Sequence, residues 1–193
     1  MGLFAGDWSA HWIGSAEMES QSVGGRPVDN KMFDPWFRKT FTLTESLKEA
    51  LIYVASIGYQ ELYVNGCKIG NAVLAPSVTD HKSRARYVTY DISHYLKKGE
   101  NVIALWLGTS WAVFPAYQRN DEPAIPMALA QAEITLTSGS KVRVITDGSW
   151  KTHASPNMLM GYWDAHHFAG EFYDASLEIN GWNEVGFDDS DWE

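Results

Sequence analysis

Residues 59–64 alternate between two kinds of position: Tyr59, Glu61 and Tyr63 fall on one face, and the residues between them fall on the other. A period of two in a run rich in aromatic and β-branched residues predicts a β-strand with two different faces. Asn65-Gly66 follows the run. Both residues tolerate a positive φ, so the dipeptide predicts a two-residue hairpin turn with positive φ at both positions. The chain is therefore expected to be built on antiparallel strand pairs.

Other segments carry strand patterns of two kinds. Residues 36–43 alternate, whereas residues 50–57 are nearly all apolar, which is typical of a central strand covered on both faces. Further strands are predicted at residues 102–107, 127–136 and 142–146. No helix longer than two turns is predicted between them, so the fold class is all-β, an antiparallel β-sandwich. The residues expected to share one core are Leu51, Tyr53, Leu62, Val64, Val102, Ala104 and Trp106.

The length of 193 residues suits one domain with appendages. We expect residues 1–35 to be an N-terminal segment that packs on the sandwich, and residues 36–175 to form the sandwich. Residues 176–193 are expected to begin a connection to a following domain. Within the first segment, the apolar run Trp8–Gly14 is expected to attach to a sheet edge, and residues 15–35 carry loop-forming residues.

The charge balance excludes some partners. The formal net charge is −9 without a basic run, so neither nucleic acid nor a membrane surface is expected as a partner. No apolar stretch approaches the ~18 residues of a membrane span, and the N-terminus lacks a signal-peptide pattern. Cys67 is the single cysteine, so no intrachain disulfide is expected. The chain is expected to be soluble, either cytoplasmic or exported with a signal that it does not itself contain.

Two short segments place Asp and Ser just ahead of a Trp: residues 147–150 and residues 188–192. Asp and Ser side chains accept hydrogen bonds from nearby backbone amides and so set turns. We predict a turn at each segment, with the Trp covering the end of a sheet.

Aromatic residues are numerous, with nine Trp, nine Tyr and eight Phe. They suit a β-sandwich core and also the stacking of sugar rings. The longest irregular segment, residues 108–123, is where a binding loop is expected. The candidate residues for weak carbohydrate binding are Asn65 at the hairpin tip and Trp111, Phe114, Tyr117, Asn120 and Asp121 in this loop. The alternative for all of them is packing or domain contact.

Carboxylates and histidines near the C-terminus offer weaker candidates. Glu171 and Asp174 lie three residues apart, and a glycosidase acid and base flank a scissile bond about 5–10 Å apart. A turn or an interdomain contact is the favoured interpretation of this pair. His166-His167 lies near Asp164, but adjacent histidines point to opposite sides of a strand. No metal site is expected there.

Several motifs together resemble a known family. They are the aromatic-Arg-Lys-x-Phe strand at residues 37–41, Leu62–Gly66, Leu74-Ala75-Pro76, Thr79-Asp80, Tyr87–Ile92 and Gly170–Ala175. In this order they resemble the N-terminal β-sandwich domain of bacterial α-L-rhamnosidases of glycoside hydrolase family 78. The resemblance implies a jelly-roll or galactose-binding-like accessory domain that supports a catalytic domain.

The resemblance also implies what the rest of such a protein does. The full enzyme removes terminal L-rhamnose from glycans and glycosides, and its acid and base lie in a downstream α/α barrel. The family's Gly-Glu-x-Tyr-Asp-Ala-Arg motif corresponds here to Glu171, Tyr173 and Asp174, with Ser176 in place of the Arg. These three are expected to be interdomain or structural residues. Some members bind rhamnose with calcium through an Asp-Asn pair, but Val64 precedes Asn65 here, so no cofactor is carried over.

Three functions therefore remain open from the sequence. The first is a non-catalytic portion of an α-L-rhamnosidase, with the downstream catalytic domain and carbohydrate as partners, L-rhamnose being the candidate sugar. The second is a stand-alone carbohydrate-binding, lectin-like domain. The third is a small glycosidase that uses Glu171 and Asp174.

Overall fold

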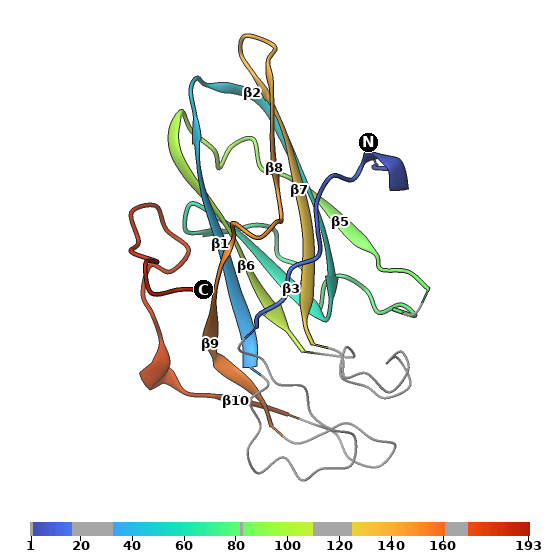
Figure 1. Ribbon diagram of the computed structural model, residues 1–193, viewed down its shortest axis with the longest axis vertical. Coiled ribbons are helices and arrows are strands. Elements are labelled where there is room, and N and C mark those ends of the chain that lie inside the picture. Colours follow the sequence, from blue (N-terminus) through green and yellow to red (C-terminus); the bar gives the residue numbers. More distant parts are fainter. Residues whose placement is uncertain (1, 17–32, 82, 110–124, 161–169) are drawn as a thin grey trace.

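The computed structural model describes residues 2–16, 33–81, 83–109, 125–160 and 170–193. In these residues ten strands form two antiparallel sheets that face each other (Figure 1). The strands are β1 (Phe33–Leu43), β2 (Leu47–Ile57), β3 (Tyr59–Val64), β4 (Cys67–Lys68), β5 (Tyr87–Asp91), β6 (Gly99–Gly108), β7 (Met127–Leu136), β8 (Lys141–Ile145), β9 (Lys151–Met160) and β10 (Gly170–Tyr173). Two short 3-10 turns are η1 (Ala5–Asp7) and η5 (Ala175–Leu177). The predicted all-β sandwich is confirmed.

The larger sheet has the strand order β10-β9-β1-β6-β3-β4, and the smaller sheet has the order β5-β2-β7-β8. The hairpin from β3 to β4 has the predicted two-residue turn, because Val64 pairs with Cys67 across it. Asn65 has φ 49° and Gly66 has φ 82°, so both positions are left-handed as predicted. Among the described residues, no helix is long and apolar enough to cross a membrane.

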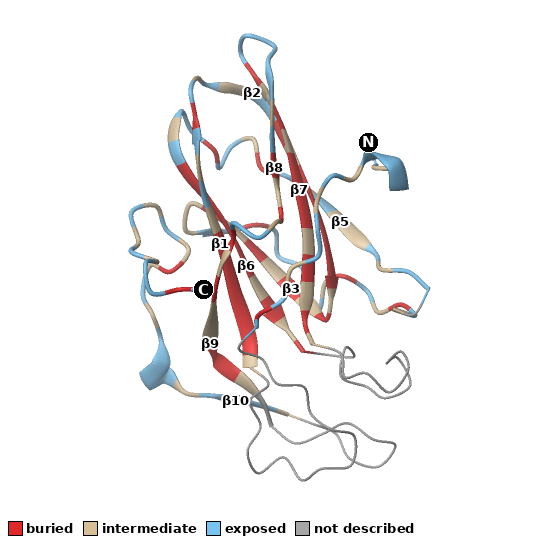
Figure 2. Ribbon diagram, in the orientation of Figure 1, coloured by how far each residue is buried: buried red, intermediate tan, exposed pale blue. Residues whose placement is uncertain are grey.

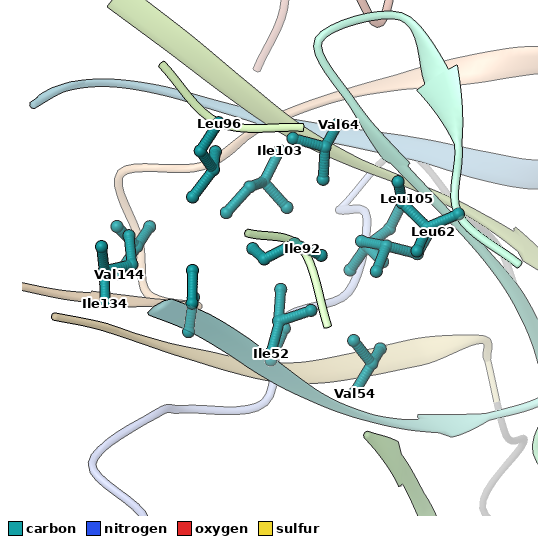
Figure 3. Close-up of a cluster of buried hydrophobic side chains, with 14 of the residues drawn as sticks. Ile52, Val54, Leu62, Val64, Ile92, Leu96, Ile103, Leu105, Ile134 and Val144 are labelled. Atoms are coloured by element: carbon teal, nitrogen blue, oxygen red, sulfur yellow. The ribbon is translucent and has the colours of Figure 1, made fainter. Parts of the chain in front are cut away.

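Aliphatic side chains fill the space between the sheets. Figure 3 shows Ile52 and Val54 of β2 opposite Leu62 and Ile103 of the larger sheet. All four are at most 1% exposed. Figure 2 shows the same pattern along the strands, where buried stretches run through the middle of both sheets. Burial of this kind supplies most of the free energy of folding.

The expected single core is wrong in its membership. Leu62 and Val64 lie between the sheets, but Ala104 and Trp106 belong to a second cluster on the outer face of the larger sheet. Tyr53 packs instead against Trp8 on the outer face of the smaller sheet, and its neighbour on that face, Leu51, is only partly buried. In β2 and β6 both faces are apolar, so hydrophobicity did not reveal which face points inward.

The N-terminal residues cover part of the smaller sheet. Ile13 forms an antiparallel bridge with Ala128 of β7, and the His11 amide donates to the Thr146 carbonyl at 2.8 Å. The Trp8 ring makes an edge-to-face contact with Tyr53 at 6.4 Å between centroids. This segment therefore hides apolar surface that β2 would otherwise expose.

A C-terminal strap, which we define as residues 178–193, covers part of the outer face of the larger sheet (Figure 1). Trp182 stacks on Trp36 of β1 with centroids 4.6 Å apart, and Trp192 stacks at 6.3 Å. The buried guanidinium of Arg38 pairs with Asp189 of the strap and donates to the Glu184 carbonyl at 3.0 Å. The strap thus supplies both apolar cover and a counter-charge.

The two Asp-Ser turns form as predicted. The Ser149 amide donates to Asp147 Oδ1 at 2.9 Å, and the Ser190 amide donates to Asp188 Oδ1 at 3.1 Å. Each turn is followed by a buried indole, Trp150 in the core between the sheets and Trp192 in the strap. These hydrogen bonds lower the pKa of both aspartates.

Candidate functional site

A pocket of about 540 Å³ lies beside the strap on the same outer face of the larger sheet. Its described lining residues are Asp34, Tyr59, Gln60, Glu61, Val73, Leu74, Trp106, Leu107, Gly108, Asn157, Glu171 and Tyr173. They come from five strands and from the segment between β4 and β5. The pocket is therefore assembled by the sheet and does not belong to one loop.

Strand register places the floor of the pocket. Tyr59 pairs with Gly108, and Glu61 pairs with Trp106, so these four residues lie side by side on one face. The alternation along β3 turns its even-numbered residues inward and leaves Tyr59 and Glu61 half-buried on the outer face. The absence of a side chain at Gly108 leaves space between Tyr59 and the carboxylate of Asp34.

Asp34 carries a buried carboxylate in the wall of the pocket, with 2% of the residue exposed. Its Oδ1 accepts the Thr109 amide at 2.8 Å, and its Oδ2 accepts from Asn157 Nδ2 at 2.5 Å. Burial outweighs these bonds and raises the pKa of Asp34 to about 7, with a further rise from the nearby negative charge of Glu171. Near neutral pH this group both holds and releases a proton.

Glu61 is a carboxylate of a different kind. It accepts from the Tyr63 hydroxyl at 2.6 Å and pairs with Lys68 of β4. Its charge is therefore balanced beside the pocket. Burial and the bond to Glu61 raise the pKa of Tyr63.

The edge strand β10 contributes Glu171 and Tyr173. The Tyr173 hydroxyl donates to Glu178, which raises the pKa of this exposed tyrosine. Asp174, the next residue, caps η5: its Oδ1 accepts from the Ser176 amide at 3.0 Å and from the Ser176 hydroxyl at 2.6 Å. Ser176, where the family motif has Arg, thus serves the turn. Glu171 lines the pocket, whereas Asp174 is not among its described lining residues.

Asn65 lies apart from the pocket-lining residues. Its Nδ2 donates to the Tyr95 carbonyl at 2.7 Å and to Asn101 Oδ1 at 2.9 Å, and its Oδ1 accepts the Val102 amide at 2.8 Å. These bonds tie the hairpin tip to the start of β6. The assignment of Asn65 to sugar contact stays a prediction.

The other candidates lie outside the described residues. This holds for Trp111, Phe114, Tyr117, Asn120 and Asp121, and also for Asp164, His166 and His167. Within the described part of the chain, no three His, Cys, Asp or Glu side chains gather as a metal site would require.

Sequence reasoning missed Asp34, Trp106 and Asn157 as site residues. Asp34 precedes a proline and looked like part of a loop, but it lies within β1. The signal that was available is the alternation of β3, which already placed Tyr59 and Glu61 together on one face.

The chemistry of the pocket suits a polyhydroxylated ligand. Aromatic rings offer flat apolar surfaces, and carboxylate and amide groups exchange hydrogen bonds with hydroxyls. Among the described lining residues, Lys, Arg and His do not occur. A concave site that combines apolar surface with a few fixed polar groups is the usual form of a small-molecule site.

Comparisons with known proteins agree on one family. The model of the alpha-L-rhamnosidase N-terminal domain matches residues 45–193. An alpha-L-rhamnosidase of Formosa agariphila is 32% identical over 96% of this chain and 20% of its own length. The structure of alpha-L-rhamnosidase from Dictyoglumus thermophilum superposes with a TM-score of 0.82 and 35% identity, covering 98% of this chain and 21% of that one.

A Pleurotus ostreatus lectin shares the fold, with a TM-score of 0.58 and 20% identity over 95% of this chain and 39% of the lectin. The chain spans about a fifth of the length of the alpha-L-rhamnosidases it matches. Since the family model covers most of the chain and the motifs of β1, the hairpin and β10 fall in the expected order, this chain belongs to the alpha-L-rhamnosidase N-terminal domain family.

Proposed function

We propose that this chain is the non-catalytic N-terminal β-sandwich portion of a longer α-L-rhamnosidase, which hydrolyses terminal L-rhamnose from glycans or glycosides. The observation that carries this proposal is the match of the family model to residues 45–193. The matched rhamnosidases continue for about four-fifths of their length outside the region that this chain covers. The catalytic domain of the same polypeptide is the expected partner.

The proposed role has two parts, support of the catalytic domain and contact with carbohydrate. Support is favoured by Glu171, Tyr173 and Asp174, because Tyr173 and Asp174 fix η5 just before the strap begins. Exposed Phe172 and Leu177 flank these residues and offer apolar surface to a neighbouring domain. Contact with carbohydrate is favoured by the pocket, whose aromatic and carboxylate lining fits a sugar.

A second candidate function is catalysis by the chain itself. One observation favours it: Asp34, with its pKa raised to about 7, lines the same pocket as Glu171. Glycosidases use such a pair, in which one carboxyl holds a proton and the other is ionised. The pair differs from Glu171 and Asp174, because Asp174 is engaged in the cap of η5.

One assay separates the two functions. The purified 193-residue chain is incubated with p-nitrophenyl α-L-rhamnopyranoside, beside the longer protein encoded by the same reading frame. We expect no turnover by the chain and turnover by the longer protein. Hydrolysis by the chain that is lost in both Asp34→Asn and Glu171→Gln would establish catalysis and overturn the non-catalytic role.

The support role has its own readout. Deleting residues 1–193 from the longer protein is expected to lower the melting temperature of its catalytic domain, because an interface that it normally buries becomes exposed. An unchanged melting temperature would contradict the support role. A reading frame that stops at Glu193 would contradict the proposal as a whole.

A further inference from the structure

The regular pairing of β1 with β9 is interrupted at Asp34. The register shifts between Phe33 and Pro35, so that Asp34 lies opposite residues 155–157 of β9. A bulge of this kind disrupts the ladder of backbone hydrogen bonds between two strands. At this place the Asn157 side chain donates to Asp34 Oδ2 at 2.5 Å. The side-chain contact therefore connects the two strands where their backbone pairing breaks.

Asn157 also connects the bulge to the edge strand β10. Its backbone lies opposite Tyr173 in the register of β9 with β10. The next amide, that of Asp174, donates to the Pro156 carbonyl at 2.9 Å. We define the edge segment as residues 170–177, which comprise β10, Asp174 and η5. Through Asn157, a change at the Asp34 carboxyl reaches the backbone on which the edge segment is held.

The edge segment is held on the sheet from one side. Among the described strands, β9 is the only neighbour of β10. The strand has four residues, and Glu171, Phe172 and Tyr173 are exposed. Short edge strands whose hydrogen bonds are exposed to solvent open locally at a much lower free energy than central strands do. A modest change in energy beside β10 therefore shifts the balance between a docked and an open edge segment.

The edge segment places a negative charge opposite Asp34. Glu171 and Asp34 line the same pocket, and Asp34 is 2% exposed. Burial raises the pKa of Asp34 to about 7, and the negative charge of Glu171 adds to this rise. Loss of the proton from Asp34 therefore creates a buried charge that repels Glu171.

The other charged groups around Asp34 do not balance this charge. Glu61 of β3 pairs with Lys68, and Arg38 of β1 pairs with Asp189 of the strap. β6 and β9 contribute to the described lining only residues without a titratable side chain. The remaining titratable side chains of the described lining, from β3 and β10, are Tyr59 and Tyr173. The repulsion between Asp34 and Glu171 is thus left without a cation in the described lining.

We propose that Asp34 is a pH-dependent switch for the edge segment, which is docked on β9 while Asp34 is protonated and opens reversibly when Asp34 is ionised. The step transfers one proton from the Asp34 carboxyl to water. In the open state Glu171 has moved away and water reaches Asp34, so the ionised form is less unfavourable there. The preference for docking is fully present below about pH 4 and is lost as pH rises through 7.

The switch also moves an apolar surface. Phe172 is 48% exposed and Leu177 is 50% exposed, and both belong to the edge segment. Opening of the segment changes where these side chains lie. Their use by a neighbouring domain rests on the support role proposed above, whereas the switch itself is a property of this chain.

Millisecond hydrogen exchange of the 193-residue chain, read by mass spectrometry, tests the switch. Peptides from the edge segment are compared with peptides from β7, which is paired on both sides by β2 and β8. Each rate is divided by the intrinsic exchange rate at the same pH. Protection of the edge segment should fall at least about 10-fold from pH 5 to pH 8, the factor for a pKa difference of one between the docked and open states. β7 should stay the more protected at both pH values.

Two variants assign the effect to the carboxylates. Asp34→Asn removes the ionisation, so protection of the edge segment should no longer change between pH 5 and pH 8. Glu171→Gln removes the facing charge at an exposed position, and its edge segment should lose about 3-fold less protection over the same pH range. Glu100→Gln is the matched control, because it removes an exposed carboxylate at the other end of β6 from the pocket. It should behave like the unchanged chain.

Each other outcome counts against the switch. Protection of the edge segment that does not change with pH would refute it, and a change that only follows the change in β7 would mean unfolding of the whole domain. Should Asp34→Asn fail to fold, Glu171→Gln still decides, because a pH dependence equal to that of the unchanged chain would overturn the role of the facing charge. None of these results bears on the non-catalytic role, which the hydrolysis assay and the deletion test decide separately.

Discussion

The outer face of the larger sheet has two halves that both carry aromatic side chains, but the strap covers only one of them. In one half, Trp36 of β1 is covered by Trp182 and Trp192 of the strap. In the other half, Tyr59 of β3 lies open to the pocket. Trp106 touches both, since it contacts Trp36 edge to face at 5.8 Å and also lines the pocket. Strand alternation supplies the same aromatic surface to both halves, and the strap decides which half is closed.

The two halves also differ in how their buried charged groups are balanced. Arg38, 1% exposed, lies in the covered half and pairs with Asp189 of the strap. Asp34, 2% exposed, lies in the open half and is held by neutral donors, Asn157 and Thr109. A buried ion without a counter-ion is costly, so its protonation equilibrium shifts instead. The open half therefore keeps a buried carboxyl whose pKa is raised, whereas the covered half keeps a neutralised ion pair.

Removing the central indole of the covered half should give the largest loss of stability. Trp36→Ala deletes the ring that Trp182, Trp192 and Trp106 contact, and should cost about 3–5 kcal/mol. Leu62→Ala, in the core between the sheets, should cost about 2–5 kcal/mol. Urea unfolding measures both, and protease cleavage within the strap should rise only in Trp36→Ala. Equal protection of the strap in the two variants would mean that the indole stack does not hold it.

The buried carboxyl of Asp34 in the open half should make the free energy of unfolding depend on pH. The folded chain holds the proton of Asp34 up to about pH 7, above the ordinary pKa of 3.8. The stabilisation that comes from this raised pKa is fully present below about pH 4, the pKa of the group in the unfolded chain, and is lost as pH rises through 7. The resulting decrease in the free energy of unfolding is at most about 4 kcal/mol. Asp34→Asn should remove this dependence. Urea unfolding at pH 5 and pH 8 measures the difference, and parallel curves for the two proteins would contradict the assignment.

A substitution in the hairpin turn should lower stability both through the turn itself and through its contact with the strap. Gly66→Val forces a β-branched residue into φ 82° and places Cβ 3.0 Å from Glu184 Cγ of the strap, at a cost of about 1–3 kcal/mol. Gly139→Val is the control, because φ is 88° there but nothing lies within 4 Å of Cβ. Thermal unfolding compares them. A loss confined to Gly66→Val would assign the cost to the strap, and equal losses would assign it to the backbone.

The smallest effect on stability is expected from a substitution that fills part of the open half. Gly108→Ala should change stability by less than about 0.5 kcal/mol, because the added methyl group meets its neighbours at ordinary distances. Thermal unfolding checks this. A large loss would mean that the space before Asp34 is needed by the fold itself.

The sequence was informative wherever one local rule decided the structure. Asn65-Gly66 has few alternatives to a hairpin turn, and the Asp147 and Asp188 turns depend on side chains two residues away. The inward faces of β2 and β6 could not be predicted, since residues such as Tyr53 and Trp106 are as apolar as the core. The outer faces of these strands are covered by segments that lie far away in the sequence.

The candidate site was predicted less well than the fold. Asp34 and Asn157 are 123 residues apart, and only the pairing of β1 with β9 brings them together. Their types and positions carry no periodic pattern, so long-range register was needed to find them. Glu171 was found through its motif, but its partner in the pocket is Asp34 and not the neighbouring Asp174.

The stacked indoles of the strap have an optical consequence. The Trp36 ring lies nearly parallel to Trp182, at 11°, and to Trp192, at 9°. Indole rings held this close in a fixed arrangement couple through their strong far-ultraviolet transitions. The far-ultraviolet circular dichroism of the chain should therefore carry a tryptophan contribution from the strap, and this contribution reports, without any label, whether the strap is docked on the sheet.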